Sequence, residues 1–411
     1  MYSRYIRAID GPISSLTRLD NHIWPYLARV TEGSITPNLR TVSLDVKMTP
    51  LDPITLIPSS NLEKVSIWNN DQSTERGVLA FLNIALSCSA PISSIDLITA
   101  SKHLLDIVPS FQRLTSLVLG LREGPDDLYF LTRLSLLPLL KALVLNTCEG
   151  KTYSPDLDFD RADFAQLSQM WVSCSPQFAL RLFQKMSAKQ LRTLRIQFDR
   201  FTPASKVSLE LFPTEVFAAA PGLRLLRLDH ESIGNYYSRG IRVHMIPPLP
   251  RYCETDDAIK THLTDQDIHQ LIKSGRLANL WHFWVPSSPS NKAPTLSSLG
   301  ILARHSPKLA SVNLSFDMQE HHILSLEDEM IRYPRMSHAL KTLTIGWTRK
   351  EPLNNAHSLK LVIIVSQYIH HFFPFIEKVL PGLNCGKEWC DGINAMVKSY
   401  QKAGADPRFS K

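Results

Sequence analysis

Two stretches of the chain, PNLRTVSLDV at 37–46 and PKLASVNLSF at 307–316, share the pattern LxxLxL, in which Val also fills the fourth place. The same spacing recurs along the sequence, with Ile or Val sometimes replacing Leu, and its first residues are Leu39, Leu62, Ile92, Leu114, Leu140, Leu167, Leu191, Leu223, Leu280, Leu309 and Leu340. Successive starts are separated by 23, 30, 22, 26, 27, 24, 32, 57, 29 and 31 residues. Recurrence at this interval indicates an array of repeated structural units.

The motif and its interval are typical of leucine-rich repeats. Places 4 and 6 lie on one face of a short strand and places 3, 5 and 7 lie on the other, because side chains alternate. Apolar residues at helical spacing in 73–89, 126–137, 176–187 and 295–306 predict helices that bury the first face. We therefore expect an α/β leucine-rich-repeat solenoid, a horseshoe with a concave parallel sheet and outer helices. The alternative, a doubly wound α/β domain, lacks the support of a glycine-rich phosphate loop after a strand.

The motif limits predict three regions. Residues 1–37 form a lead-in with a capping helix, residues 38–350 form the repeat array, and residues 351–411 form a C-terminal capping helix and a polar tail. Insertions are expected near 149–163 and 233–262. For the second, two alternatives remain, a hidden repeat and an extended loop. The apolar stretch 358–380 predicts one long amphipathic helix, which would cover the core of the last repeat.

Composition restricts the class of protein. The 411 residues are 44% hydrophobic and 20% charged, which is the balance of a well-packed soluble chain. The net charge of +7 is spread along the sequence without a basic block, so nucleic acid is not the expected partner. The first residues have no apolar core of signal-peptide length, and the most apolar run, 134–145, is interrupted by Lys141. We expect a monomer of the cytoplasm or nucleus that does not contact a membrane.

The side chains that could carry chemistry do not form a known catalytic or metal-binding pattern. The stretch CGKEWC at 385–390 could offer two thiolates, but the spacing is poor for zinc and no second cysteine pair accompanies it. The pairs His321–His322 and His370–His371 are adjacent, so on a helix their side chains would point about 100° apart. No GxSxG elbow or paired-acid context is present. We predict no catalytic residue, no metal, no cofactor and no enzymatic activity, and we expect the six cysteines to be reduced.

The outward strand positions are more informative about function. Place 5 carries Trp171, Arg195, Arg227 and Trp284 in four successive copies of the motif, while His282 lies at place 3 and Asp229 at place 7. Tryptophan and arginine dominate the energies of protein interfaces, so these six residues predict a partner-binding surface on the concave face. The two arginines favour a partner with an acidic segment. The alternative is a set of isolated amphipathic side chains on a solvated sheet.

Three stretches resemble a known family: HIWPYLARVTEGSITPNLRTVSL near the start, LTDQDIHQLIKSGRLANLWHFWV at 263–285 and SQYIHHFFPFIEKVLPG at 366–382. They are similar to F-box/leucine-rich-repeat proteins of mushroom-forming fungi. The resemblance implies a substrate-binding repeat region of a ubiquitin-ligase receptor, whose F-box would dock on the ligase adaptor. Residues 1–38 contain no LPxEI helix, so adaptor binding is expected only if an F-box lies upstream. The alternative is a free-standing repeat scaffold or inhibitor unconnected to a ligase.

Overall fold

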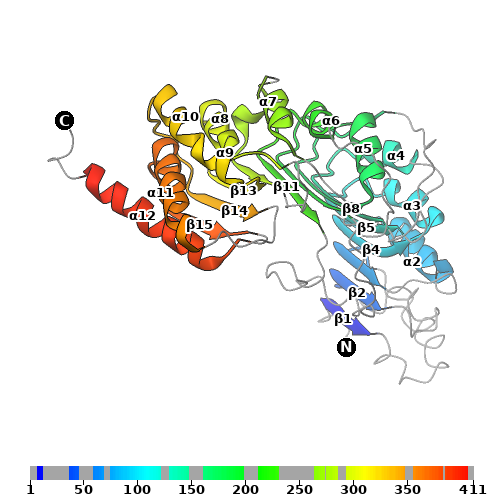
Figure 1. Cartoon of the computed structure of the whole chain (residues 1–411). Coiled ribbons are helices and arrows are strands. Elements are labelled where there is room, and N and C mark those ends of the chain that lie inside the picture. Colours follow the sequence, from blue (N-terminus) through cyan, green and yellow to red (C-terminus); the bar gives the residue numbers. More distant parts are fainter. Residues whose placement is uncertain are drawn as a thin grey trace, which may run out of the picture. The chain divides into compact units, whose positions relative to one another are not determined.

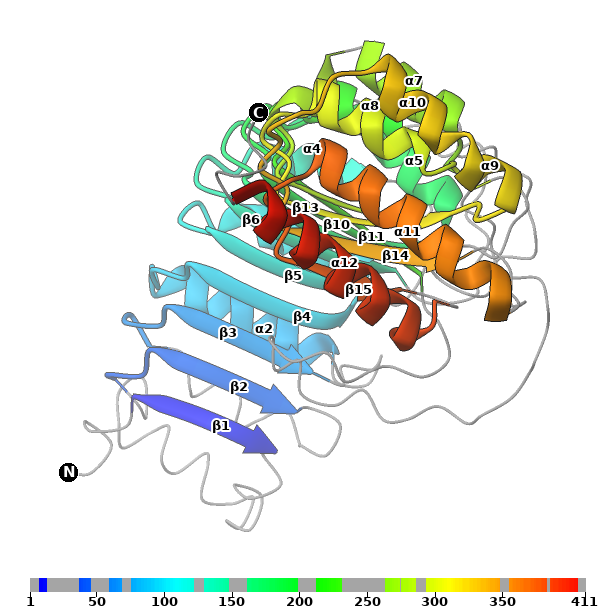
Figure 2. The same ribbon diagram turned by 60° about the vertical axis from the view of Figure 1, so that its left-hand side comes forward.

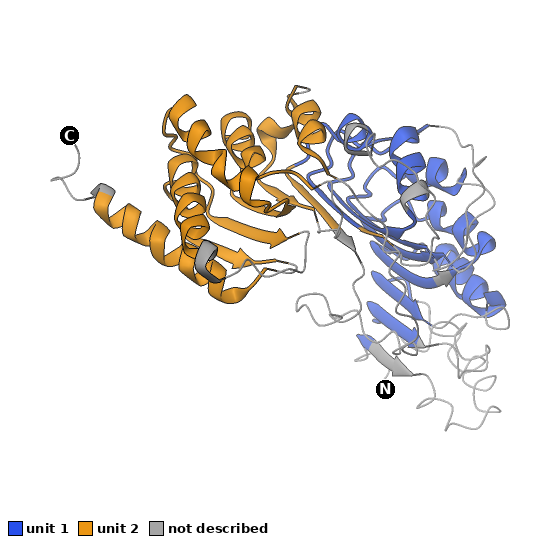
Figure 3. Ribbon diagram, viewed as in Figure 1, with its two compact units in different colours: residues 1–196, 215–223 blue, residues 197–214, 224–411 orange. Residues whose placement is uncertain are grey.

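The structure is a computed structural model that describes residues 7–12, 37–45, 59–68, 75–121, 129–147, 161–198, 212–230, 263–273, 275–285, 293–347, 355–382 and 385–405. The chain divides into two compact units, residues 1–196 with 215–223 and residues 197–214 with 224–411 (Figure 3). In each unit a sheet forms one layer and helices form a second layer against one of its faces (Figure 1). The sheet face opposite these helices is called the open face below.

The sheet of the first unit follows the order of the chain. Its strands run in the order β1-β2-β3-β4-β5-β6-β8-β10, and Figure 2 shows β1 to β6 side by side. The bounds are β1 (Ala8–Pro12), β2 (Thr41–Asp45), β3 (Lys64–Trp68), β4 (Ser94–Ala100), β5 (Ser116–Leu121), β6 (Ala142–Thr147), β8 (Gln169–Cys174) and β10 (Thr193–Phe198). Each strand is therefore added beside the one from the preceding repeat, as the recurring motif predicts.

The register of these strands aligns the motif places. Places 4 of β2, β3, β4, β5, β6 and β8 face one another in parallel pairs as Val42, Val65, Ile95, Leu117, Leu143 and Met170. Places 6 align in the same way as Leu44, Ile67, Leu97, Leu119, Leu145 and Val172. All of these side chains are buried. The two columns form the core because the period-two alternation sends them toward the helices.

The helices of the first unit cover this core. They are α2 (Glu75–Ser87), α3 (Lys102–Ile107), α4 (Tyr129–Ser135), α5 (Pro176–Lys185) and α6 (Phe212–Ala219), with a 3-10 turn at Val108–Ser110. Helix α2 buries Val78, Phe81, Leu82 and Ala85, which share one helical face. Helix α5 begins after Ser175, whose side chain accepts the N–H of Phe178 at 3.3 Å. Two short strands, β7 (Ala162–Asp163) and β9 (Met186–Ser187), pair separately from the main sheet.

The second unit continues the same construction. Its strands are β11 (Leu225–His230), β12 (His282–Trp284), β13 (Ser311–Phe316), β14 (Thr342–Trp347) and β15 (Lys378–Pro381), in that order. Place 4 again forms a buried column of Leu226, Phe283, Val312, Leu343 and Val379. Strand β11 pairs directly with β12, so the 57-residue interval between their motifs adds no strand between them in the described sheet.

The helices of the second unit are α7 (Asp265–Lys273), α8 (Ser297–His305), α9 (Glu320–Leu324), α10 (Leu326–Arg332), α11 (Asn355–Phe372) and α12 (Lys387–Ala405), with a 3-10 turn at Arg276–Asn279. Tyr368 of α11 ties three of them together, because its oxygen accepts the N–H of Gly300 and its hydroxyl donates to Glu329 at 2.8 Å. A Cβ at Gly300 would lie 2.6 Å from that oxygen. Glycine therefore allows α8 and α11 to approach each other.

Helix α12 bonds the backbone of the last strand at Val379 and that of the segment before the strand. The Asn394 amide accepts the N–H of Val379 and donates to its carbonyl, both at 2.7 Å, in the way a further strand would. Gln401 donates to the carbonyls of Pro374 and Ile376. The Asn394 contacts satisfy the backbone groups of Val379 in the last strand of the sheet, which could otherwise pair with another chain.

The topology and register confirm the predicted α/β leucine-rich-repeat fold. The strands extend beyond the limits of 38–350 set by the motif, because β1 aligns Gly11 with Leu44 and β15 aligns Pro381 with Ile345. Gly11 and Pro381 stand at place 6 of these two strands, where the motif requires Leu, Ile or Val, so the motif is not recognised there. The predicted long helix over 358–380 was wrong at its end, since α11 stops at Phe372, before Pro374, and β15 follows. The insertion 233–262 lies outside the described residues, as does 149–163 apart from its last three.

Candidate functional site

Trp171 and Arg195 lie on the open face of the first unit. Both occupy the outward place 5 of their strands, β8 and β10, and burial alternates along these strands so that each is half-exposed between two buried residues. On its other side Trp171 is aligned with Val144 of β6, which is aligned in turn with Val118 of β5. The indole therefore stands between an apolar stripe and an arginine.

Arg195 and Trp171 form a cation–π pair, called the first Arg–Trp pair. The Arg195 Cζ lies 4.3 Å from the centroid of the indole ring, within the range in which the ring quadrupole attracts a guanidinium. The indole Nε1 of Trp171 is buried and has no hydrogen-bond partner among the described residues. The guanidinium is thus held in place by a ring face, and a planar guanidinium can bind a carboxylate through two parallel N–H groups.

Arg227 and Trp284 form a second Arg–Trp pair on the open face of the second unit. They are aligned partners on the parallel strands β11 and β12, and the Arg227 Cζ lies 4.6 Å from the indole centroid. Here the indole Nε1 donates to the Ser311 hydroxyl of β13 at 3.2 Å. The ring of Trp284 thus stacks on Arg227 of the preceding strand, and its N–H bonds Ser311 of the following strand.

The other two predicted site residues belong to the second unit. His282 lies at place 3 of β12, half-buried, and burial lowers its pKa below the ordinary value of 6.5. Asp229 is part of β11, but its side chain lies outside the described residues. The structure thus brings Trp171 to Arg195 and Trp284 to Arg227 as two separate contacts, one in each unit.

A third cluster on the open face was not among the predicted site residues. Asp96 lies at place 5 of β4, aligned with Ser66, and therefore between Lys64 and Trp68 of β3. Burial raises its pKa to about 6, while the nearby Trp68 indole and the charge of Lys64 act in the opposite direction. The signal in the sequence was an acidic residue at place 5 beside a repeat with Lys at place 3 and Trp at place 7.

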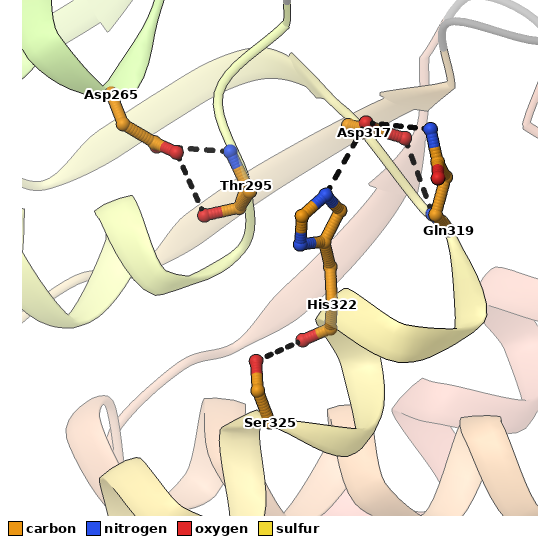
Figure 4. Close-up of polar contacts among 6 residues, drawn as sticks. All are labelled: Asp265, Thr295, Asp317, Gln319, His322 and Ser325. Carbon is orange, nitrogen blue, oxygen red and sulfur yellow. Dashed lines mark hydrogen bonds and ion pairs between the residues drawn. The ribbon is translucent and has the colours of Figure 1, made fainter.

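Polar residues at the helix ends of the second unit have structural roles (Figure 4). The Asp265 carboxylate accepts the N–H and the hydroxyl of Thr295 at 2.9 and 3.0 Å, and also the hydroxyl of Ser298, which ties α7 to the start of α8. Asp317 accepts the backbone N–H of Gln319 at 3.3 Å and lies 3.6 Å from His322. Asp317 occupies the place where a typical repeat carries Asn or Cys, and it bonds the bent backbone as that place requires.

The side chains of the two histidine pairs contact neighbouring side chains and backbone groups. The rings of His321 and His322 lie against each other with centroids 3.9 Å apart, which differs from the divergent orientation expected for adjacent helical residues. His371 Nε2 contacts the Tyr333 carbonyl at 2.9 Å, and His370 contacts Arg335 and stacks near Tyr400. Within the part of the chain that the structure describes, no group of three or more His, Cys, Asp or Glu side chains could hold a metal ion. No helix among those same residues has the length and apolarity needed to cross a membrane.

Comparison with known proteins adds two structural likenesses. No protein-family model and no curated protein matches the chain. Among solved structures, it is similar to the leucine-rich repeat-containing protein LegL7 from Legionella pneumophila, at 14% identity and a TM-score of 0.38, over 88% of this chain and 97% of that one. A protein from Bacteroides fragilis gives 11% identity and a TM-score of 0.28, over 74% of this chain and 66% of that one.

Proposed function

We propose that the protein is a non-catalytic recognition module that binds a protein partner on the open face of its sheets. The observation that carries this proposal is the repeated stacking of an arginine on an outward tryptophan, Arg195 on Trp171 and Arg227 on Trp284. Packing within a repeat does not require tryptophan at place 5, because that place points away from the core. Tryptophan and arginine are the side chains most enriched among the residues that dominate interface energies.

The chemistry of the pairs favours an acidic partner segment. Each guanidinium is oriented by a ring face, so it loses less conformational freedom when a carboxylate binds than a freely rotating side chain would. In the first unit, the adjacent stripe of Val118 and Val144 offers apolar contact beside the charged group. A partner that combines acidic and apolar side chains fits this arrangement best. Binding should weaken as salt is added, because ions screen exposed charges.

The resemblance to fungal F-box/leucine-rich-repeat proteins supports a more specific role. In that role the chain would be the substrate-binding region of a ubiquitin-ligase receptor, with the partner on the open face as the substrate. A free-standing repeat scaffold or inhibitor would use the same face by occupancy alone. The two roles differ in a single contact, the one with the ligase adaptor.

The recognition role can be tested in cells by affinity purification and mass spectrometry with three forms of the protein. These are the parent, the Trp171→Ala, Trp284→Ala double variant, and Thr344→Ala. Thr344 is the matched control because it is half-exposed at place 5 of β14, outside both pairs. We expect a set of proteins recovered with the parent and Thr344→Ala that is lost with the double variant. Equal recovery with all three forms would contradict the proposal.

The ligase role is tested separately with purified adaptor subunit. Residues 1–38 lack the apolar helix pattern of an F-box, so the chain as written should not retain the adaptor in a direct pull-down. Recovery of ligase subunits from cells, through a longer form of the protein, would support the receptor role. Recovery of partners without any ligase subunit would favour the scaffold or inhibitor.

A further inference from the structure

Two cysteines face each other at the start of the last helix, outside the surface described above. Cys385 and Cys390 have their Sγ atoms 3.3 Å apart, and both thiols are free. A disulfide bond joins sulfurs at about 2.05 Å, so a shift of little more than 1 Å would bring them to bonding distance. Cys88, which lies beyond the end of α2, is a free cysteine with an exposed side chain and offers a comparison within the same chain.

The two thiols differ in access to solvent. Cys390 lies in the first turns of α12 and is buried, while Cys385 is half-exposed in the segment that leads into the helix. The backbone holds both in place, because the N–H of Cys390 donates to the Gly386 carbonyl and the N–H of Cys385 donates to that of Gly382, each at 3.3 Å. A half-exposed thiol next to a buried one is the arrangement in which the first can react with a reagent and the second can resolve the product.

We propose that Cys385 and Cys390 are a reversible dithiol–disulfide site whose oxidant is a low-molecular-weight disulfide such as oxidised glutathione. Cys385 attacks one sulfur of the glutathione disulfide and transfers its proton to the thiolate of Cys390, which releases one glutathione thiolate and leaves a mixed disulfide on Cys385. Cys390 then loses that proton to solvent and attacks the Cys385 sulfur, which releases the second glutathione. Two electrons pass from the protein sulfurs to the glutathione disulfide, and the two glutathione thiolates that leave take up protons from solvent.

The hydrogen bond between the thiols supports this order of events. Donation from the Cys385 thiol lowers the pKa of Cys390 and so favours the Cys390 thiolate, the form that can accept the proton that Cys385 releases. The same contact, together with burial, raises the pKa of Cys385, which makes transfer of that proton to its neighbour a necessary part of the attack. Thiolates are the reactive form in exchange, so a partner that takes the proton accelerates it.

The disulfide would tether the segment before α12 to the helix that bonds the last strand. Helix α12 binds the backbone of β15 through Asn394, and Trp389 packs edge-to-face on Trp347 of β14 with ring centroids 5.3 Å apart. Oxidation should therefore slow the opening of the C-terminal part of the second unit. Amide hydrogen exchange of α12 and β15 would report this directly.

The test uses the whole protein in glutathione buffers of rising oxidised fraction. Free thiols are blocked by alkylation, and the protein is digested with trypsin without reductant. Lys387 lies between the two cysteines, so the disulfide would join two separate tryptic peptides, residues 379–387 and 388–398. We expect this linked species to appear as the oxidised fraction rises and to disappear on addition of dithiothreitol. Cys88 should carry a glutathione adduct under the same conditions, which shows that the oxidant is active.

Single substitutions separate the two steps. With Cys390→Ala, the glutathione adduct should persist on Cys385, because no thiol is available to resolve it. With Cys385→Ser, Cys390 should remain unmodified, because it is buried. The proposal is overturned if Cys88 of the parent becomes glutathionylated while Cys385 and Cys390 are recovered as alkylated thiols. It is equally overturned if the parent accumulates a stable adduct on Cys385, as in Cys390→Ala, without the linked peptides.

Discussion

The first Arg–Trp pair, Trp171 with Arg195, and the second, Trp284 with Arg227, use the same residue types at the same motif place in different surroundings. In the first unit the arginine comes from the later strand, Val144 flanks the indole, and the indole N–H has no partner among the described residues. In the second unit the arginine comes from the earlier strand and Ser311 accepts the indole N–H.

The difference separates what the repeat determines from what its neighbours determine. Place 5 fixes the direction of the side chain, because alternation along the strand is a property of the backbone. Whether the polar edge of the indole is satisfied depends on the residue in the adjacent strand, which no rule of the motif specifies. The first pair is therefore the more apolar of the two, and the second is the more polar and the better hydrogen-bonded.

The largest expected effect concerns the core beneath each pair. Leu194 and Leu226 lie at place 4 of β10 and β11 and are buried. Substitution of either by alanine should lower the free energy of unfolding by about 2–5 kcal/mol, because it removes a buried side chain and leaves a cavity. Denaturant unfolding measures the change, with Thr344→Ala as the outward control. A loss no greater than that of the control in one unit would show that its strand is not packed as described.

A smaller effect on stability, which depends on pH, is expected at Asp96. This residue lies beside Trp68, in the way that an arginine lies beside Trp171 and Trp284. The folded state raises the pKa of Asp96 from 3.8 to about 6, so it favours the protonated form. The stability that this provides is present below pH 3.8 and is lost as pH rises through about 6. Asp96→Asn should therefore be more stable than the parent above this window by about 1–3 kcal/mol.

Thermal or denaturant unfolding of both forms across the pH range measures this effect. The advantage of Asp96→Asn should shrink toward the acid end of the window. A difference in stability that stays constant with pH would show that Asp96 is not destabilised by burial.

The smallest effect isolates the indole N–H of the two pairs. Phenylalanine in place of Trp171 removes a buried donor that has no partner, whereas phenylalanine in place of Trp284 removes a hydrogen bond to Ser311. Both changes remove the same ring area, so the difference between them reports the N–H. We expect Trp284→Phe to be less stable than Trp171→Phe by about 1 kcal/mol. Equal stability of the two variants would show that the hydrogen bond adds nothing.

Much of the fold could be predicted from the sequence because the motif records the buried face of each strand. The columns of places 4 and 6 follow from that pattern, and so do helices such as α2 and α8. The first and last strands could not be predicted, since Gly11 and Pro381 interrupt the pattern while the backbone still pairs. Side-chain amides such as Asn394, which bond a strand edge, are specified by tertiary contact and leave no periodic signal.

The residues of the candidate site could be predicted from the sequence, but the contacts between them could not. Alternation placed Trp171, Arg195, Arg227 and Trp284 on the outward face, and the sequence predicted these residue types as interface anchors. The stacking of each arginine on a tryptophan depends on rotamers and on the neighbouring strand, which sequence spacing does not fix. The half-buried Asp96 lies beside Lys64 and Trp68 of the preceding repeat, and this contact between strands is also not fixed by sequence spacing.

The central claim, that the outward tryptophans anchor a protein partner, is tested most directly by the dissociation constant of the purified partner measured by calorimetry. Each of Trp171→Ala and Trp284→Ala should weaken binding by about 2 kcal/mol or more while leaving the protein folded, because both side chains lie outside the core. Thr344→Ala should bind like the parent. If the double variant Trp171→Ala, Trp284→Ala binds the partner as tightly as the parent, the open face is not the binding surface.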